Sequence, residues 1–197
     1  MGSERCIRDR LCGDETEPEH KALVRKESIC WIKSPENGSR QLNIVEAKSV
    51  SKLVANAMRA GLSHDRIAVV TPFRRQAAAV RRLVQLSLGN AFEAVPVVDT
   101  VERVQGLTVD LVIFSLCTTD IEYASEVAAF LFSPNRLNVA VSRARTKVIV
   151  IACDQTCNAI PNEYSGLLAL NRFKNALSLI KKPLRLNGDV SVDQSLL

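Results

Sequence analysis

The chain has 197 residues, of which 47% are hydrophobic and 24% are charged, the balance of a soluble globular protein. Its net charge of +5 permits a polyanionic partner without requiring one. No run approaches the roughly 18 apolar residues of a membrane helix, and MGSERCIRDR lacks the apolar core of a signal peptide. We therefore expect no membrane association and a cytoplasmic or other intracellular location.

The first part of the chain predicts a peripheral segment followed by a strand and a helix. Residues 1–27 mix acids and bases densely, which is typical of a mobile or peripheral segment. SICWIK then predicts a strand, and SPENGSR predicts a turn. From about residue 43 to residue 60, apolar residues spaced three and four apart predict a helix that begins with NIVEA and ends at Gly61.

Apolar runs and amphipathic stretches alternate through the rest of the chain. The predicted strands are IAVVTPF, AVPVVDT, VDLVIFSLC and TKVIVIA. Helices are predicted over residues 74–88, in a region that ends at residue 130, over residues 136–145 and over residues 164–180, before a frayed tail at 183–197. This order predicts one α/β domain over residues 28–182, with a mostly parallel sheet between helices.

The helix predicted over residues 136–145 is unusual because it carries three arginines. At 100° per residue, Arg136 and Arg143 share one flank of an apolar stripe, and Asn138 and Arg145 share the other. An ordinary basic surface helix explains this segment equally well.

Polar residues gather where the predicted strands end. TPFRRQ follows IAVV, and DTVERVQG follows VPVV. Ligands of parallel sheets bind beyond the carboxyl ends of the strands, and the hydroxyls of Thr71 and Thr100 are suited to phosphate oxygens. The alternative is that these residues cap the helices behind them.

Cysteine and histidine spacing favours no metal site. Cys153 and Cys157 form a lone CxxxC without a second pair, and His20 and His64 lie far apart in the chain.

Three motifs occur in one order: VVTPFRRQ, VDTVERVQGLTVDLVIFSL and NRLNVAVSRARTKVIVIA. The series resembles motifs four, five and six of the second RecA-like domain of superfamily 1 helicases, in the branch of the RNA-surveillance helicase Upf and the replication nuclease-helicase Dna. There the signatures look like "ITPYRAQ", "VDTVDRFQGQEKDVVI" and "RRLNVALTRAR". The resemblance spans roughly residues 43–153 and implies a RecA-like fold of the P-loop NTPase type.

The resemblance also implies roles for individual residues. Arg143 matches the catalytic arginine that reaches the γ-phosphate, and Arg145 matches a second arginine of that motif, structural or linking the nucleotide to the nucleic acid. The nucleotide-binding positions are Gln105, Gly106, Thr108 and Arg143. The positions implied to hold single-stranded nucleic acid are Thr71, Pro72, Arg74, Gln76, Asp99 and Thr100.

Two departures from the family pattern qualify these roles. Thr108 stands where the family usually has an acid, which weakens the nucleotide contact at that turn, although Asp110 fits the pattern. The chain has no GxxxxGK[ST] loop and no acidic pair at a strand end for Mg²⁺. ATP and Mg²⁺ would therefore be bound mainly by an N-terminal RecA-like domain in cis.

The sequence thus predicts the C-terminal motor domain of an ATP-dependent helicase, inactive as an ATPase by itself. It would supply the arginine finger and part of a single-stranded nucleic-acid track, with DNA slightly favoured over RNA. One alternative is a stand-alone nucleic-acid-binding module derived from a helicase. Another is an unrelated α/β phosphate-binding enzyme, which would have to explain three ordered motifs by coincidence.

Overall fold

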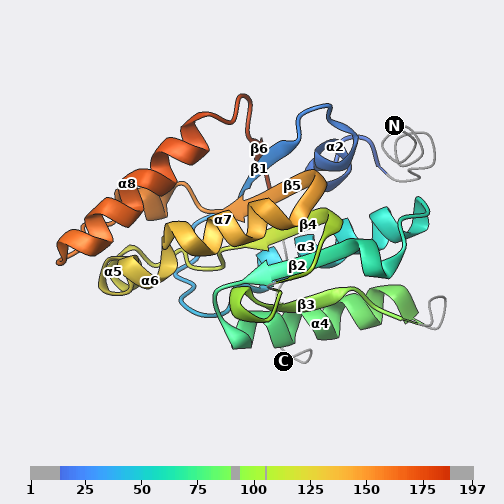
Figure 1. Cartoon of the computed structure of the whole chain (residues 1–197), viewed down its shortest axis with the longest axis horizontal. Coiled ribbons are helices and arrows are strands. Elements are labelled where there is room, and N and C mark those ends of the chain that lie inside the picture. The colour runs from blue at the N-terminus through green and yellow to red at the C-terminus, as the bar shows by residue number, and fades with distance from the viewer. Residues whose placement is uncertain (1–13, 90–93, 105, 187–197) are drawn as a thin grey trace.

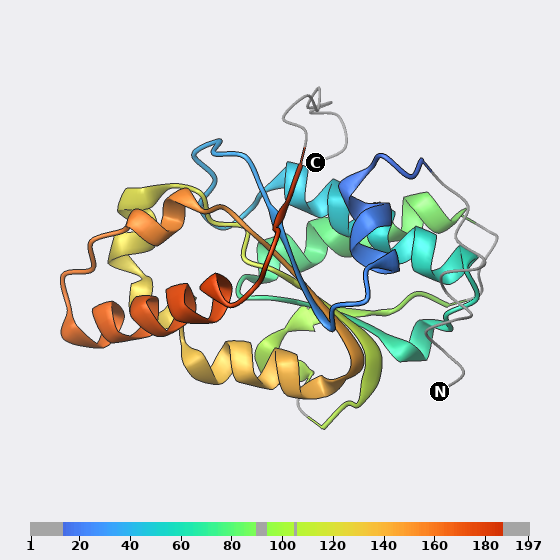
Figure 2. The same ribbon diagram turned by 90° about the horizontal axis from the view of Figure 1, so that it is seen from above.

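The computed structural model of the chain describes residues 14–89, 94–104 and 106–186, which form a central sheet between two layers of helices (Figures 1 and 2). The strands are β1 (Ile29–Lys33), β2 (Ile67–Thr71), β3 (Val97–Thr100), β4 (Val109–Ser115), β5 (Ala144–Ala152) and β6 (Leu184–Arg185). They lie in the order β3-β2-β4-β5-β1-β6, and each neighbouring pair is parallel. The predicted α/β fold with a mostly parallel sheet is confirmed.

Helices connect the strands and cover both faces of the sheet. They are α2 (Pro18–Val24), α3 (Ile44–Arg59), α4 (Arg74–Leu88), α5 (Ile121–Glu126), α6 (Ala128–Leu131), α7 (Pro134–Arg143) and α8 (Tyr164–Ser178). Short 3₁₀ turns lie at η1 (His64–Arg66), η3 (Val101–Arg103) and η4 (Gln155–Asn158). Helices α2, α3 and α4 cover one face, and α5 to α8 lie toward the other (Figure 2).

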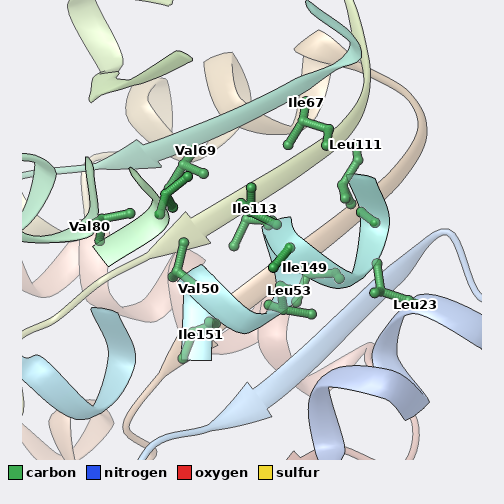
Figure 3. Packing of buried hydrophobic residues seen from close by; sticks show 14 of the residues in the cluster. Leu23, Val50, Leu53, Ile67, Val69, Val80, Leu111, Ile113, Ile149 and Ile151 are labelled. Carbon is green, nitrogen blue, oxygen red and sulfur yellow. The ribbon is translucent and has the colours of Figure 1, made fainter. Parts of the chain in front are cut away.

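The strands are apolar almost throughout because both faces of the sheet are buried. Alternate residues of β2 belong to different cores: Ile67 and Val69 face α3 and α4, whereas Ala68 and Val70 face the other layer. Figure 3 shows the first core, in which Ile113 of β4 lies among side chains from neighbouring strands and α3. This two-sided burial holds the strand ends in fixed positions.

Part of the segment expected at the periphery packs on the domain. Helix α2 buries Ala22 and Leu23, and the Lys147 ammonium donates to the carbonyls of Ala22, Leu23 and Arg25 at 3.1, 3.2 and 2.5 Å. A cation at these carbonyls suits the negative end of the helix. Strand β6 likewise lies inside the expected tail and pairs with β1. The domain boundaries at residues 28 and 182 stay predictions. Helix α2 and strand β6 lie outside these boundaries but pack against the domain between them.

The arginine helix ends two residues earlier than the periodicity predicts. Ala144 is extended, with ψ of 125°, and pairs with Val109 at the start of β5. Arg145 therefore lies on a strand, and the prediction that it shares a helix flank with Asn138 is wrong. The sheet ladder begins directly after Arg143, and this tertiary pairing overrides the helical period.

Substitution of the central strand should be far more costly than substitution of an exposed helical position. Ile113 is 0% exposed, so Ile113→Ala should lower the free energy of unfolding by about 2–5 kcal/mol. Leu86→Ala, at a residue that is 58% exposed on α4, should change it by less than about 0.5 kcal/mol. Urea unfolding of the two variants tests this, and equal midpoints would contradict the described core.

Candidate nucleotide and nucleic-acid sites

The motif residues fall at two opposite edges of the sheet, because all the paired strands run the same way. Thr71 and Thr100 end β2 and β3 and are directly opposite each other in the parallel register. Gly106 and Thr108 precede β4, and Arg143 precedes β5. The residues expected to hold nucleic acid thus lie at the carboxyl edge, whereas those expected at the nucleotide lie at the amino edge.

At the amino edge, Arg143 is the last residue of α7 and is half-buried. Its Nη1 donates to the Leu107 carbonyl at 3.4 Å, and its Nε and Nη2 donate to Ser142 Oγ at 3.3 and 3.2 Å. These are long contacts to neutral acceptors, and within residues 14–89, 94–104 and 106–186 no ion pair holds the guanidinium. The side chain can therefore turn toward an anion at low cost.

The turn before β4 brings other predicted nucleotide-site residues close to Arg143. Gly106 has φ of +88° and is exposed, and no atom lies within 4 Å of the place a Cβ would occupy. Thr108 is also exposed, two residues before a buried acid, Asp110, which pairs with Arg66. Gln105 lies outside the described residues. Asp110 is thus committed to a structural ion pair, whereas Gly106 and Thr108 are exposed in the turn that contacts Arg143 through the Leu107 carbonyl.

At the carboxyl edge, most of the predicted side chains are buried. Thr71 is 0% exposed, Thr100 is 8% exposed and Pro72 is buried. Asp99 is half-buried and lies 3.5 Å from Arg103 and 3.9 Å from Arg81. The hydroxyls of Thr71 and Thr100 therefore do not stand on the surface as their position after a strand suggested.

Arg74 and Gln76 belong to the same motif but differ in their exposure to solvent. Arg74 is exposed at the first turn of α4 and can meet a phosphate. Gln76 is fully buried: its Nε2 donates to Asn43 O at 3.2 Å and Ser115 Oγ at 3.1 Å, and its Oε1 accepts from Asn43 N at 2.9 Å. The amide of Gln76 joins α3, α4 and β4 and is not exposed, and its contact with nucleic acid stays a prediction.

Gln76 belongs to a buried polar network centred on Glu46 of α3. Glu46 is 0% exposed and accepts three hydrogen bonds: from Ser34 Oγ at 2.7 Å, from Ser115 Oγ at 2.7 Å and from Cys117 N at 2.9 Å. Ser34 follows β1, and Ser115 and Cys117 follow each other closely at the end of β4. One carboxyl group thereby ties α3 to the ends of two strands at the carboxyl edge.

Burial raises the pKa of Glu46 from 4.5 to about 7, against the opposing effect of the donors from Ser115, Ser34 and Cys117. Burial also raises the pKa of the Cys117 thiol well above its ordinary value, and the nearby Glu46 carboxyl raises it further. The thiol is therefore protonated wherever Glu46 titrates. When the acid is neutral near pH 7, a proton on Oε1 can be donated to Ser34 Oγ, while Oε2 still accepts from Ser115 and Cys117.

Sequence reasoning missed this network, although a periodic signal was present. Glu46 is four residues before Val50, and Gln76 is four residues before Val80, so both continue the apolar stripe of their helix. A polar residue in line with an apolar stripe predicts burial with a partner. The partners themselves come from strand ends far away in the chain.

The described residues offer no metal site, since no three His, Cys, Asp or Glu side chains among them come together to hold an ion. Within the same ranges, no helix has both the length and the apolar character needed to cross a membrane.

The parallel six-stranded sheet with helices on both faces makes this a RecA-like α/β domain. The chain matches the AAA domain family over residues 13–155, which is well over half of its length. Together with its helicase relatives, this match shows that the chain belongs to the superfamily 1 helicases of the Upf-like branch. The family predicted from the three motifs is confirmed.

Three relatives show the extent of the similarity. The chain is 28% identical over 169 residues to the regulator of nonsense transcripts 1 homolog of Drosophila melanogaster, covering 79% of this chain and 14% of that protein. It is 30% identical over 137 residues to the human DNA replication ATP-dependent helicase/nuclease DNA2, covering 70% of this chain and 12% of that protein. It is 34% identical over 91 residues to helicase sen1 of Schizosaccharomyces pombe, covering 46% of this chain and 5% of that protein. The chain thus spans only a small part of each relative.

Replacing Glu46 should change how stability depends on pH. Its folded pKa is raised above the unfolded value of 4.5, so its favourable contribution is complete below pH 4.5 and is lost as pH rises through about 7. In Glu46→Gln the amide Nε2 can donate to Ser34 while Oε1 keeps the other two donors, and this group no longer titrates. The difference between wild-type and variant unfolding free energies should move in the variant's favour by on the order of 3 kcal/mol between pH 4.5 and pH 8. Urea unfolding across this range measures it, and a constant difference would contradict the raised pKa.

Proposed function

We propose that this chain is the second, C-terminal RecA-like motor domain of an ATP-dependent helicase that acts on single-stranded nucleic acid. The observation that carries the proposal is the separation of two cationic groups: Arg143 at the amino edge and Arg74 at the carboxyl edge. The helicase family of the chain supports an ATP-dependent activity for the whole protein.

Arg143 is proposed as the arginine finger. A guanidinium beside a transferring phosphoryl group stabilises the negative charge that develops there. Arg143 suits this role because its hydrogen bonds, at 3.2–3.4 Å, go to neutral acceptors and the neighbouring turn at Gly106 is exposed. Arg145 is exposed on β5, directly beyond the helix end, and is proposed as a secondary contact.

ATP and Mg²⁺ fit this chain only in part. Arg143, Gly106 and Thr108 could contact the phosphates, but the chain has no phosphate loop, and its described residues bring together no carboxylate cluster for Mg²⁺. When bound, Mg²⁺ would neutralise phosphate charge. We propose that an N-terminal RecA-like domain in cis supplies its ligands and the phosphate loop, while this domain supplies the guanidinium.

The nucleic-acid track is proposed to cross the carboxyl edge at Arg74. Contacts there would be to phosphate, which makes them independent of sequence and sensitive to salt. The backbone of residues 71–73 and 99–100 borders the same edge, in place of the buried hydroxyls. We propose DNA as the slightly preferred strand, with RNA as the alternative that direct comparison of the two would decide.

The purified 197-residue chain should have no Mg²⁺-dependent ATPase activity, because it lacks the phosphate loop that positions the nucleotide. A phosphate-release assay with and without single-stranded nucleic acid measures this. Turnover above a no-protein control would rule out the proposed division between two domains. Binding of nucleic acid without turnover is equally expected of a stand-alone binding module, so a second test is needed in the longer protein.

In the full-length enzyme, Arg143→Ala should reduce ATP turnover by at least about 10³-fold and leave strand affinity nearly unchanged. Arg74→Ala should weaken binding of the strand. It should also make the slope of log affinity against log salt concentration less steep, by the amount that corresponds to the loss of about one phosphate contact. Turnover and a salt titration of binding should be measured for both variants, with Arg172→Ala, at an exposed position on α8, as the charge-matched control. Equal losses of both variants in both assays would contradict the assignment of two sites.

A further inference from the structure

Lys147 is a charged side chain in the buried part of β5. The residues that follow it on the strand, 148–152, are apolar and buried, and Lys147 itself is only 7% exposed. Side chains alternate along a strand, so Lys147 lies on the same face of the sheet as Ile149, which belongs to the core under α3. A cation is rarely buried unless acceptors surround it. The position therefore requires polar partners on the α2–α3 side of the sheet.

The ammonium group of Lys147 binds the carboxyl end of α2. Its Nζ donates to the carbonyl oxygens of Ala22 and Leu23 at 3.1 and 3.2 Å, and to that of Arg25, the C-cap residue, at 2.5 Å. The last four carbonyls of an α-helix have no partner within the helix and carry partial negative charge. Lys147 thus satisfies carbonyls that the helix leaves open, and an apolar side chain of the same length would leave them without this donor.

Two other contacts hold the same segment. Leu23 is 5% exposed and belongs to the first core (Figure 3), and Glu17, just before α2, pairs with Lys52 of α3 at 2.7 Å. The Lys52–Glu17 pair lies at the surface, where ion pairs add little stability. A helix of seven residues is not stable by itself. The place of α2 therefore depends mainly on Leu23 and Lys147.

The segment that Lys147 holds lies beside the strand that follows the proposed finger. Lys147 is four residues after Arg143, which is at most about 13 Å of extended chain. Ser28, just before β1, is joined to the same strand, because its carbonyl accepts from Val148 N at 2.7 Å. Residues 17–28 therefore reach the sheet at the amino edge, which is also the edge of Arg143.

We propose that Lys147 is a positioning residue. It fastens residues 17–28 at the amino edge, so that an N-terminal domain joined through them is held where it can close on Arg143. The inference rests on the proposed function, in which that domain binds ATP and this one supplies the finger. A chain held at Lys147 has a shorter free tether than one held only at β1. The effective concentration of joined domains falls roughly as the −3/2 power of tether length, or about threefold for each doubling.

Amide hydrogen exchange in the 197-residue chain tests the fastening. Lys147→Met keeps the length of the side chain and removes the ammonium group. The amide of Arg25, which donates to Lys21 O at 3.2 Å, should then exchange at least about tenfold faster, while the amides of β4 keep their protection. Lys52→Met removes a cation that pairs with the same segment and should leave this exchange within about twofold of wild type. Equal exchange at Arg25 in wild type and Lys147→Met would overturn the fastening.

In the full-length enzyme, Lys147→Met should lower kcat/KM for ATP by about threefold or more, whereas Lys147→Arg, which keeps a cation, and Lys52→Met should stay close to wild type. Affinity for a single strand should not change, because Arg74 lies at the opposite edge. A residue that acts through the finger has no effect once the finger is gone. Lys147→Met combined with Arg143→Ala should therefore turn over ATP at the rate of Arg143→Ala alone. A further loss in the double variant would indicate general structural damage and overturn the positioning role.

The outcomes separate this inference from the function on which it rests. If Arg143→Ala lowers turnover and Lys147→Met does not, the positioning role is wrong and the proposed finger stands. If Arg143→Ala leaves turnover unchanged, the proposed function itself fails.

A second variant decides the question if Lys147→Met does not fold. Leu23→Ala loosens α2 from the core side and leaves β5 intact, so it should reproduce both the faster exchange at Arg25 and the lower kcat/KM. Faster exchange at Arg25 with unchanged turnover in Leu23→Ala would show that the place of α2 does not matter to the finger, and the proposal would be wrong.

Discussion

The hydrogen bonds of the buried Glu46 carboxyl group hold together the carboxyl edge of this sheet. Its three donors come from the ends of β1 and β4, while Gln76 joins the start of α4 to Asn43 and to Ser115 of the same network. Removing an acid from water is costly, and the cost is offset only when the donors are all in place. Gln76 lies in the first turn of α4, two residues after Arg74. The network therefore holds in place the backbone that carries Phe73 and Arg74.

The parallel direction of the strands has a second consequence, which is the separation of the two cationic groups. A connection that follows one strand leaves at the carboxyl edge, and the residues that precede the next strand arrive at the amino edge. Arg74 follows β2 and Arg143 precedes β5, so Arg74 lies at the carboxyl edge of the sheet and Arg143 at the amino edge. Helices cover both faces of the sheet between them. Because the full length of the strands separates the two edges, one small ligand does not contact both, which favours two ligands over one.

Much of the fold was predictable from the sequence, because two-sided burial leaves continuous apolar strands and the helices show a clear apolar stripe. Three features were not predictable from local pattern alone. The end of α7 at Arg143 is decided by the pairing of Ala144 with Val109, and the burial of Thr71 by the strands beside it. The contacts of the Phe73 ring with Tyr123 and Phe130 need residues from three segments that only the tertiary fold brings together. For Glu46 and Gln76 the stripe did indicate burial, but not the partners.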